Sequence, residues 1–168
     1  MTNRLPTRAV FAAIGLTAFC LLLAAAYAQY GPGKQQPCPL CILQRYTYMA
    51  LTAWCLIAAL HGLRGTGEKT YALGAAIIAA FGTGLATWQV NKGASMTSCL
   101  ADPIGEFVNG LPSANWWPEY LFANGGCADQ YPPLFGLTVP VWSLLWFSLF
   151  TMAGVVSVAI AFRATCPR

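Results

Sequence analysis

Four long apolar stretches constrain this chain more than any other feature. Each contains at least 19 residues, and they occupy residues 9–28, 42–60, 71–90 and 139–162. At a rise of about 1.5 Å per residue, a helix of that length crosses the roughly 30 Å hydrocarbon layer of a membrane. Isolated strands cannot satisfy their backbone hydrogen bonds in lipid. The sequence therefore predicts an all-α membrane protein, a bundle of four transmembrane helices.

The composition agrees with this fold class. Only 8% of the 168 residues are charged and 57% are hydrophobic, whereas roughly 25% of a typical soluble domain is charged. This excludes a soluble enzyme and a disordered chain. The length suits one domain, so residues 1–168 are predicted to form a single integral membrane domain. The basic residues form no cluster that could follow a phosphate backbone, so we expect no nucleic-acid partner.

The distribution of Lys and Arg predicts how the chain crosses the membrane. Six of the nine lie in the N-terminal segment, the 61–70 turn and the C-terminal tail: Arg4, Arg8, Arg64, Lys69, Arg163 and Arg168. Short cytoplasmic segments carry an excess of basic residues. Both termini are therefore expected in the cytoplasm, and the loops at 29–41 and 91–138 are expected to face outward.

The second outer loop is long and carries its own helix signals. Asp102 and Pro103 make a good helix start, with a capping acid before a proline. The aromatic-rich run at 116–122 is typical of a short helix that lies flat in the membrane interface. We therefore expect a short interfacial helix in this loop.

The first span has an alternative interpretation as a signal peptide. Ala26, Tyr27 and Ala28 resemble a signal-peptidase site. However, an apolar stretch of about 20 residues exceeds the usual apolar core of roughly 7–15 residues. A transmembrane helix is favoured, and the later topology is the same in either case.

The predicted topology sorts the seven cysteines into two groups. Cys20, Cys55 and Cys166 lie in spans or in the tail and are interpreted as apolar filler or incidental thiols. The other four lie in the outward loops: Cys38, Cys41, Cys99 and Cys127. In an oxidising space these predict two disulfides. Of the three possible pairings, 38–41 with 99–127 is the simplest.

The CxxC pair of Cys38 and Cys41 favours redox chemistry. It closes a very short ring, so it adds little as a structural staple, and such thiols exchange readily. The motif ends where the second helix is expected to begin, and a helix N-terminus favours a thiolate. Arg45 lies four residues after Cys41 on the same face. Arg45 alone could be a snorkelling residue, but beside a CxxC at membrane depth a functional role is favoured.

Other uses of these cysteines remain open at this point. Zinc takes four ligands, and the only histidine, His61, is expected at the opposite membrane face. Cys99 and Cys127 could complete a four-cysteine site, which is the less favoured reading. The loop pair could equally be a staple or an exposed disulfide that a soluble partner attacks. A disulfide-stapled membrane scaffold without turnover is therefore an alternative to an enzyme.

The chain resembles the DsbB family in its four spans, in the cysteine pair of its second outer loop and in one run of residues. That run is Pro37-Cys38-Pro39-Leu40-Cys41-Ile42-Leu43-Gln44-Arg45. These bacterial inner-membrane proteins use quinone to reoxidise the periplasmic dithiol oxidase DsbA. The resemblance implies a quinone-dependent thiol-disulfide oxidoreductase with periplasmic redox loops. It implies a DsbA-like partner and a quinone cofactor, either ubiquinone or menaquinone.

The resemblance also implies a role for each site residue. Cys99 corresponds to the cysteine that forms a mixed disulfide with DsbA, and Cys127 to its partner, which exchanges with the first loop. Cys38 corresponds to the cysteine that receives this exchange. Cys41 corresponds to the cysteine that faces the quinone, and Arg45 to the arginine that supports both thiolate and quinone.

One departure concerns the outer end of the third span. Many relatives carry His or Arg there, whereas this chain has no basic residue before Lys92. Gln89, Trp88 or Lys92 could take that place, or Arg45 could make the head-group contact alone. Gln44, beside Arg45, is a further candidate for quinone contact. A vitamin K epoxide reductase-like enzyme shares the four-helix CxxC plan. Its loop cysteines usually precede the CxxC, whereas Cys99 and Cys127 follow it.

Overall fold

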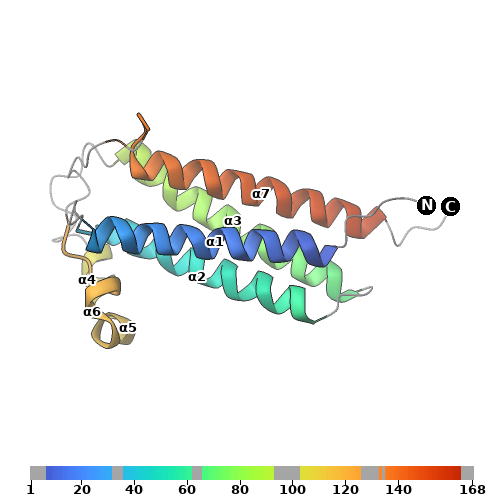
Figure 1. The fold of residues 1–168 in the computed structure, drawn as a ribbon, viewed down its shortest axis with the longest axis horizontal. Coiled ribbons are helices and arrows are strands. Elements are labelled where there is room, and N and C mark those ends of the chain that lie inside the picture. The colour runs from blue at the N-terminus through green and yellow to red at the C-terminus, as the bar shows by residue number, and fades with distance from the viewer. Residues whose placement is uncertain are drawn as a thin grey trace.

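The computed structural model describes residues 7–31, 36–61, 66–92, 103–125, 133 and 135–163. Four long helices form a bundle: α1 (Thr7–Tyr30), α2 (Pro39–Leu60), α3 (Thr66–Lys92) and α7 (Val139–Arg163). Each is long and apolar enough to cross a membrane, which confirms the four predicted spans. Three short helices lie together at one end of the bundle (Figure 1): α4 (Pro103–Asn109), α5 (Pro112–Trp116) and α6 (Pro118–Leu121).

Helix α2 begins earlier than the sequence predicts. It starts at Pro39, three residues before the expected position 42, with Cys38 as its N-cap. The Cys38 sulfur accepts a hydrogen bond from the Cys41 amide at 3.3 Å. Proline suits the first helical position because its missing N–H would have no partner there. Cys41 therefore lies within the first turn of α2, and the loop expected at 29–41 is shorter.

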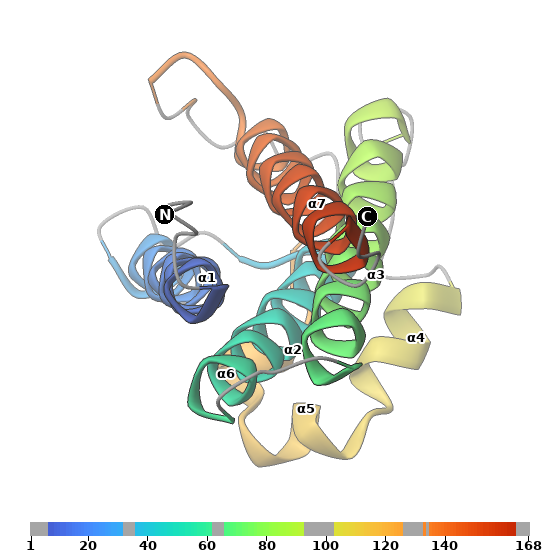
Figure 2. The same cartoon turned by 90° about the vertical axis from the view of Figure 1, so that its right-hand side faces the viewer.

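The long helices pack in sequence around the bundle. Helix α1 packs on α2, α2 on α3, and α3 most closely on α7. At Gly154 an added Cβ would lie 2.8 Å from the Cα of Ala76, so glycine permits this close approach. Tyr48 stacks on Phe147 with ring centroids 4.1 Å apart. Helices α1 and α7 make little direct contact, and Figure 2 shows them set apart in a view along the bundle.

Contacts between helix ends define the two ends of the bundle. The Arg8 guanidinium donates to the carbonyl oxygens of Ala59 and Leu60 at 3.1 and 3.2 Å. The Lys69 ammonium lies 4.7 Å from the ring centre of Phe162. The start of α1, the end of α2, the start of α3 and the end of α7 therefore share one end, opposite the short helices (Figure 1).

The short helices rest on the first turns of α2. Ile42, Val108 and Ala123 are fully buried and pack together as a small second core. The Asn109 side chain accepts from the Ala123 amide at 2.8 Å and donates to its carbonyl oxygen at 3.2 Å. These contacts hold α4 and the segment after α6 beside the CxxC motif.

Candidate redox site at the start of the second helix

The two CxxC sulfurs lie next to each other at the start of α2. The Sγ atoms of Cys38 and Cys41 are 2.6 Å apart, so a small further approach reaches the disulfide bond length of about 2.05 Å. Cys38 is buried, whereas Cys41 is partly exposed. The hydrogen bond with Cys41, together with burial, raises the pKa of the Cys38 thiol. Cys38 therefore ionises less readily than an ordinary cysteine thiol, and Cys41, which is less buried, is the more available sulfur.

Two buried glutamines adjoin the sulfurs. Gln44 on α2 and Gln89 on α3 are each 4% exposed. The Gln44 side-chain nitrogen donates to the Gln89 side-chain oxygen at 2.7 Å. The Gln89 nitrogen in turn lies 3.3 Å from both Cys38 Sγ and Cys41 Sγ. The structure thus brings these two candidates for quinone contact together with the cysteines.

Arg45 is enclosed by neighbouring elements rather than extended toward water. It is 7% exposed, and its Nη1 donates to Gln29 Oε1 and to the Tyr120 carbonyl oxygen, both at 2.6 Å. The guanidinium carbon lies 4.3 Å from the centre of the Tyr120 ring, within the range of a cation–π contact. Gln29 also donates to the Glu119 carbonyl oxygen. Arg45 therefore joins α1, α2 and α6 at the edge of the site.

Tyr120 and Gln29 are site neighbours that sequence reasoning missed. The Tyr120 hydroxyl donates to the Leu22 carbonyl oxygen on α1 at 3.0 Å. Burial raises the pKa of Tyr120, and the adjacent Arg45 charge opposes that rise. Sequence spacing carries no signal for these contacts, because they depend on how the second loop folds back onto α1 and α2.

A cavity of about 390 Å³ opens beside the cysteines, between α1 and α7. Its volume falls within the roughly 300–1,000 Å³ typical of ligand pockets. Apolar residues of α1 and α7 form most of its wall. Polar and aromatic groups face it from the other side and from α7: Cys41, Gln44, Arg45, Tyr48, Gln89 and Ser143. The arrangement places a reactive sulfur, hydrogen-bond donors and an apolar space together.

The remaining predicted site residues lie elsewhere. Trp88 is 40% exposed and does not line this cavity. Adjacent helical residues point about 100° apart, so Trp88 does not share the buried direction of Gln89. Cys99 and Cys127 lie outside the described residues, so their pairing stays a prediction.

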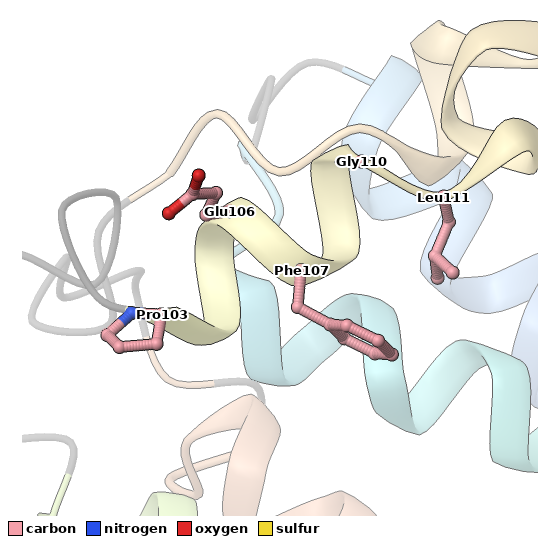
Figure 3. A pocket seen from close by; sticks show the side chains of 5 residues that line it. All are labelled: Pro103, Glu106, Phe107, Gly110 and Leu111. Carbon is pink, nitrogen blue, oxygen red and sulfur yellow. The ribbon is translucent and has the colours of Figure 1, made fainter.

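A second, shallower hollow of about 430 Å³ lies on α4 and shares no lining residue with the cavity at Cys41. Figure 3 shows Phe107 and Leu111 pointing to one side of α4, while Glu106 points away from them. Phe107 is 62% exposed and Trp116 on α5 is 85% exposed. The short helices thus present aromatic side chains outward.

These features define a class: a membrane-embedded dithiol protein whose CxxC pair meets an apolar cavity. The family model described as disulfide bond formation protein DsbB matches residues 7–157. The chain therefore belongs to the DsbB family, and its role is disulfide bond formation as an oxidoreductase.

Individual relatives match over most of their length. Disulfide bond formation protein B of Herminiimonas arsenicoxydans is 36% identical over 150 residues, which is 87% of this chain and 91% of the relative. The protein of the same name from Ralstonia nicotianae is 36% identical over 156 residues, covering 90% and 93%. Disulfide bond formation protein B 1 of Burkholderia lata is 39% identical over 149 residues, covering 86% and 84%.

Proposed function

We propose that this protein reoxidises a DsbA-like periplasmic thiol oxidase. Electrons pass through Cys99 and Cys127, then through Cys38 and Cys41, to a membrane quinone. The protein resides in the bacterial inner membrane, with its cysteine end in the periplasm. One observation carries the proposal: a CxxC sulfur pair at the start of a helix long and apolar enough to cross a membrane borders an apolar cavity.

The chemistry is two successive thiol–disulfide exchanges. In each, a thiolate attacks one sulfur of a disulfide, a mixed disulfide forms, and a second thiolate resolves it. The reduced partner loses two electrons and two protons and becomes a disulfide, while the Cys38–Cys41 pair becomes a dithiol. A bound quinone supplies the terminal acceptor for those two electrons and two protons.

The residues around the cavity fit a quinone. Apolar walls suit a hydrocarbon ring and tail, and the Arg45 guanidinium is a strong donor for a carbonyl oxygen. Arg45, Gln44 and Gln89 would hold the head group beside Cys41. The cavity lies between α1 and α7, which make little direct contact, so an isoprenoid tail can leave toward lipid. Both ubiquinone and menaquinone share this chemistry.

Backbone contacts support exchange between the two cysteine pairs. The amides of Asn124 and Gly125 both donate to the Pro37 carbonyl oxygen at 3.1 Å, one residue before Cys38. Gly125 is buried, and an added Cβ would overlap the carbonyl group of Gln36. Cys127 follows two residues later in the sequence, which suits it to exchange with Cys38.

The energetics require an oxidising CxxC pair or a strong electron acceptor. The reduction potential of DsbA is about −120 mV, whereas that of a thioredoxin-like CxxC pair is about −270 mV. A pair poised like thioredoxin would make oxidation of DsbA uphill by about 7 kcal/mol. Donors around Cys41 stabilise the reduced thiolate form and so raise the potential. Electron withdrawal by quinone acts in the same direction.

The test is quinone reduction by purified protein with reduced DsbA and a short-chain ubiquinone, followed by absorbance. Cys41→Ser should stop quinone reduction but leave exchange between DsbA and the loop pair intact. Cys99→Ala should stop electron entry from DsbA. Cys20→Ser, on the exposed face of α1, serves as the matched control. Normal turnover by Cys41→Ser, or none by the unmodified protein, would overturn the proposal.

A further inference from the structure

Gln89 contacts both CxxC sulfurs through its side-chain amide. Its amide is 4% exposed within a membrane span, where an unpaired polar group is costly. Its nitrogen is 3.3 Å from each CxxC sulfur, and its oxygen accepts from Gln44 at 2.7 Å. Both the nitrogen and the oxygen of the Gln89 side-chain amide therefore have hydrogen-bond partners.

The direction of the amide depends on the charge of the sulfurs. A thiolate can only accept hydrogen bonds, so it requires the amide N–H₂ rather than the carbonyl oxygen. With the Gln89 nitrogen turned toward sulfur, its oxygen must face Gln44. The Gln44 nitrogen meets that oxygen, so the pair is arranged for a negatively charged sulfur.

Arg45 contributes differently. The hydrogen bonds of its Nη1 go to Gln29 and to the Tyr120 carbonyl oxygen. Its effect on Cys41 is therefore the field of a nearby charge, whereas Gln89 acts by direct contact. Contact donors to a charged acceptor are roughly twice as strong as those to a neutral one.

We propose that Gln89 is the hydrogen-bond donor that stabilises the Cys41 thiolate, and that Gln44 is a positioning residue that keeps the Gln89 nitrogen turned toward sulfur. This is distinct from the quinone contact expected of both residues. It rests on the proposed function only in taking Cys41 as the reacting thiolate.

The experiment measures the pH profile of Cys41 alkylation in the reduced full-length protein. A brief iodoacetamide pulse at each pH, followed by peptide mass spectrometry, separates Cys41 from the other cysteines and uses neither quinone nor DsbA. Gln89→Met keeps the size of the side chain and removes the donor. Gln89→Glu replaces the donor with an acid. Thr87→Val, on the exposed face of the same helix, is the matched control.

We expect the midpoint of the profile to rise by about one pH unit in Gln89→Met, which is a tenfold change in equilibrium. It should rise further in Gln89→Glu, whose carboxylate repels the thiolate. Gln44→Leu should give a smaller rise in the same direction, because the Gln89 amide is then free to turn. Thr87→Val should not move the midpoint.

The expected rise of the midpoint, largest in Gln89→Glu, smaller in Gln89→Met and smallest in Gln44→Leu, separates this role from simple loss of structure. Helix content and thermal unfolding, measured alongside, identify any variant that does not fold, and Gln89→Glu and Gln89→Met test the donor independently. Unmoved midpoints in folded Gln89 variants would overturn this proposal but would not bear on the proposed function. Failure of the unmodified protein to reduce quinone would overturn the proposed function alone.

Discussion

At the residue scale, Arg45 joins the cavity to the second loop. In Arg45→Met the side chain keeps its length but loses its charge, and the buried Tyr120 carbonyl loses its donor. Because hydrogen bonds from charged groups contribute about 1.5–3 kcal/mol, we expect the KM for quinone to rise by about tenfold. The measurement is quinone reduction against quinone concentration.

Arg45→Lys is the companion variant. An ammonium restores charge but lacks the planar fork that suits several acceptors at once. It should rescue the KM only in part. Exchange of the loop cysteines with DsbA should change little in either variant, because Cys99 and Cys127 belong to the predicted second outer loop and not to the segment that carries Arg45. An unchanged KM in Arg45→Met would limit Arg45 to holding α6 in place.

The two CxxC thiols should also differ in their response to pH. The hydrogen bond with Cys41 and burial raise the pKa of Cys38. A raised pKa means less thiolate at any given pH, so Cys38 should react more slowly than an ordinary cysteine, and its rate should increase as the pH rises. At pH 7 we expect iodoacetamide to modify Cys41 about tenfold faster than Cys38. Equal rates by peptide mass spectrometry would contradict this assignment.

At the scale of elements, the segment after α6 is held against the start of α2. Gly125→Ala introduces a Cβ that overlaps the Gln36 carbonyl and should displace this segment from Pro37. We expect DsbA-dependent quinone reduction to fall by about tenfold, which corresponds to roughly 1.4 kcal/mol. Oxidation of a pre-reduced Cys38–Cys41 pair by quinone should be nearly unaffected.

Gly84→Ala is the control for this substitution, because an added Cβ at Gly84 meets nothing within 4 Å. Stopped-flow measurement of the two half-reactions separates electron entry from electron exit. Equal rates of entry in the unmodified protein and Gly125→Ala would show that this contact does not govern exchange between the pairs.

The long helices could be predicted because lipid imposes one simple requirement on them. Their observed ends differ from the predicted ends by a few residues, and the largest differences have local causes. Cys38 caps α2 and Pro39 starts it, while α3 extends through the polar residues from Thr66. Apolar runs mark the hydrocarbon layer, whereas caps and polar turns set where each helix stops.

The site was predictable only in part. Cys38, Cys41 and Arg45 follow from motif spacing on one chain segment. Contacts between elements, such as those of Gln89 and Tyr120, depend on helix rotation and on the fold of the second loop. A sequence shows which residues share a face, but it does not show which faces meet.

At the scale of the whole molecule, the distribution of basic residues predicts the orientation. A membrane-impermeant thiol reagent, applied to intact cells after reduction, should label Cys99 and Cys127. It should spare Cys166, since the tail is predicted on the cytoplasmic side. Permeabilised cells provide the control in which Cys166 becomes accessible. Labelling of Cys166 in intact cells would reverse the topology and remove the basis for a periplasmic redox partner.

The position of the cavity between α1 and α7 changes what substrate concentration means for this protein. A ligand that arrives through that side is dissolved in the bilayer, so its mole fraction among the lipids governs occupancy. Diluting proteoliposomes with buffer should leave turnover per protein unchanged. Fusing them with quinone-free vesicles should lower turnover in proportion to the added lipid. Under the proposed function, a KM for this site is therefore a ratio of quinone to lipid, and the quinone content of the membrane would set the rate at which the cell makes disulfides.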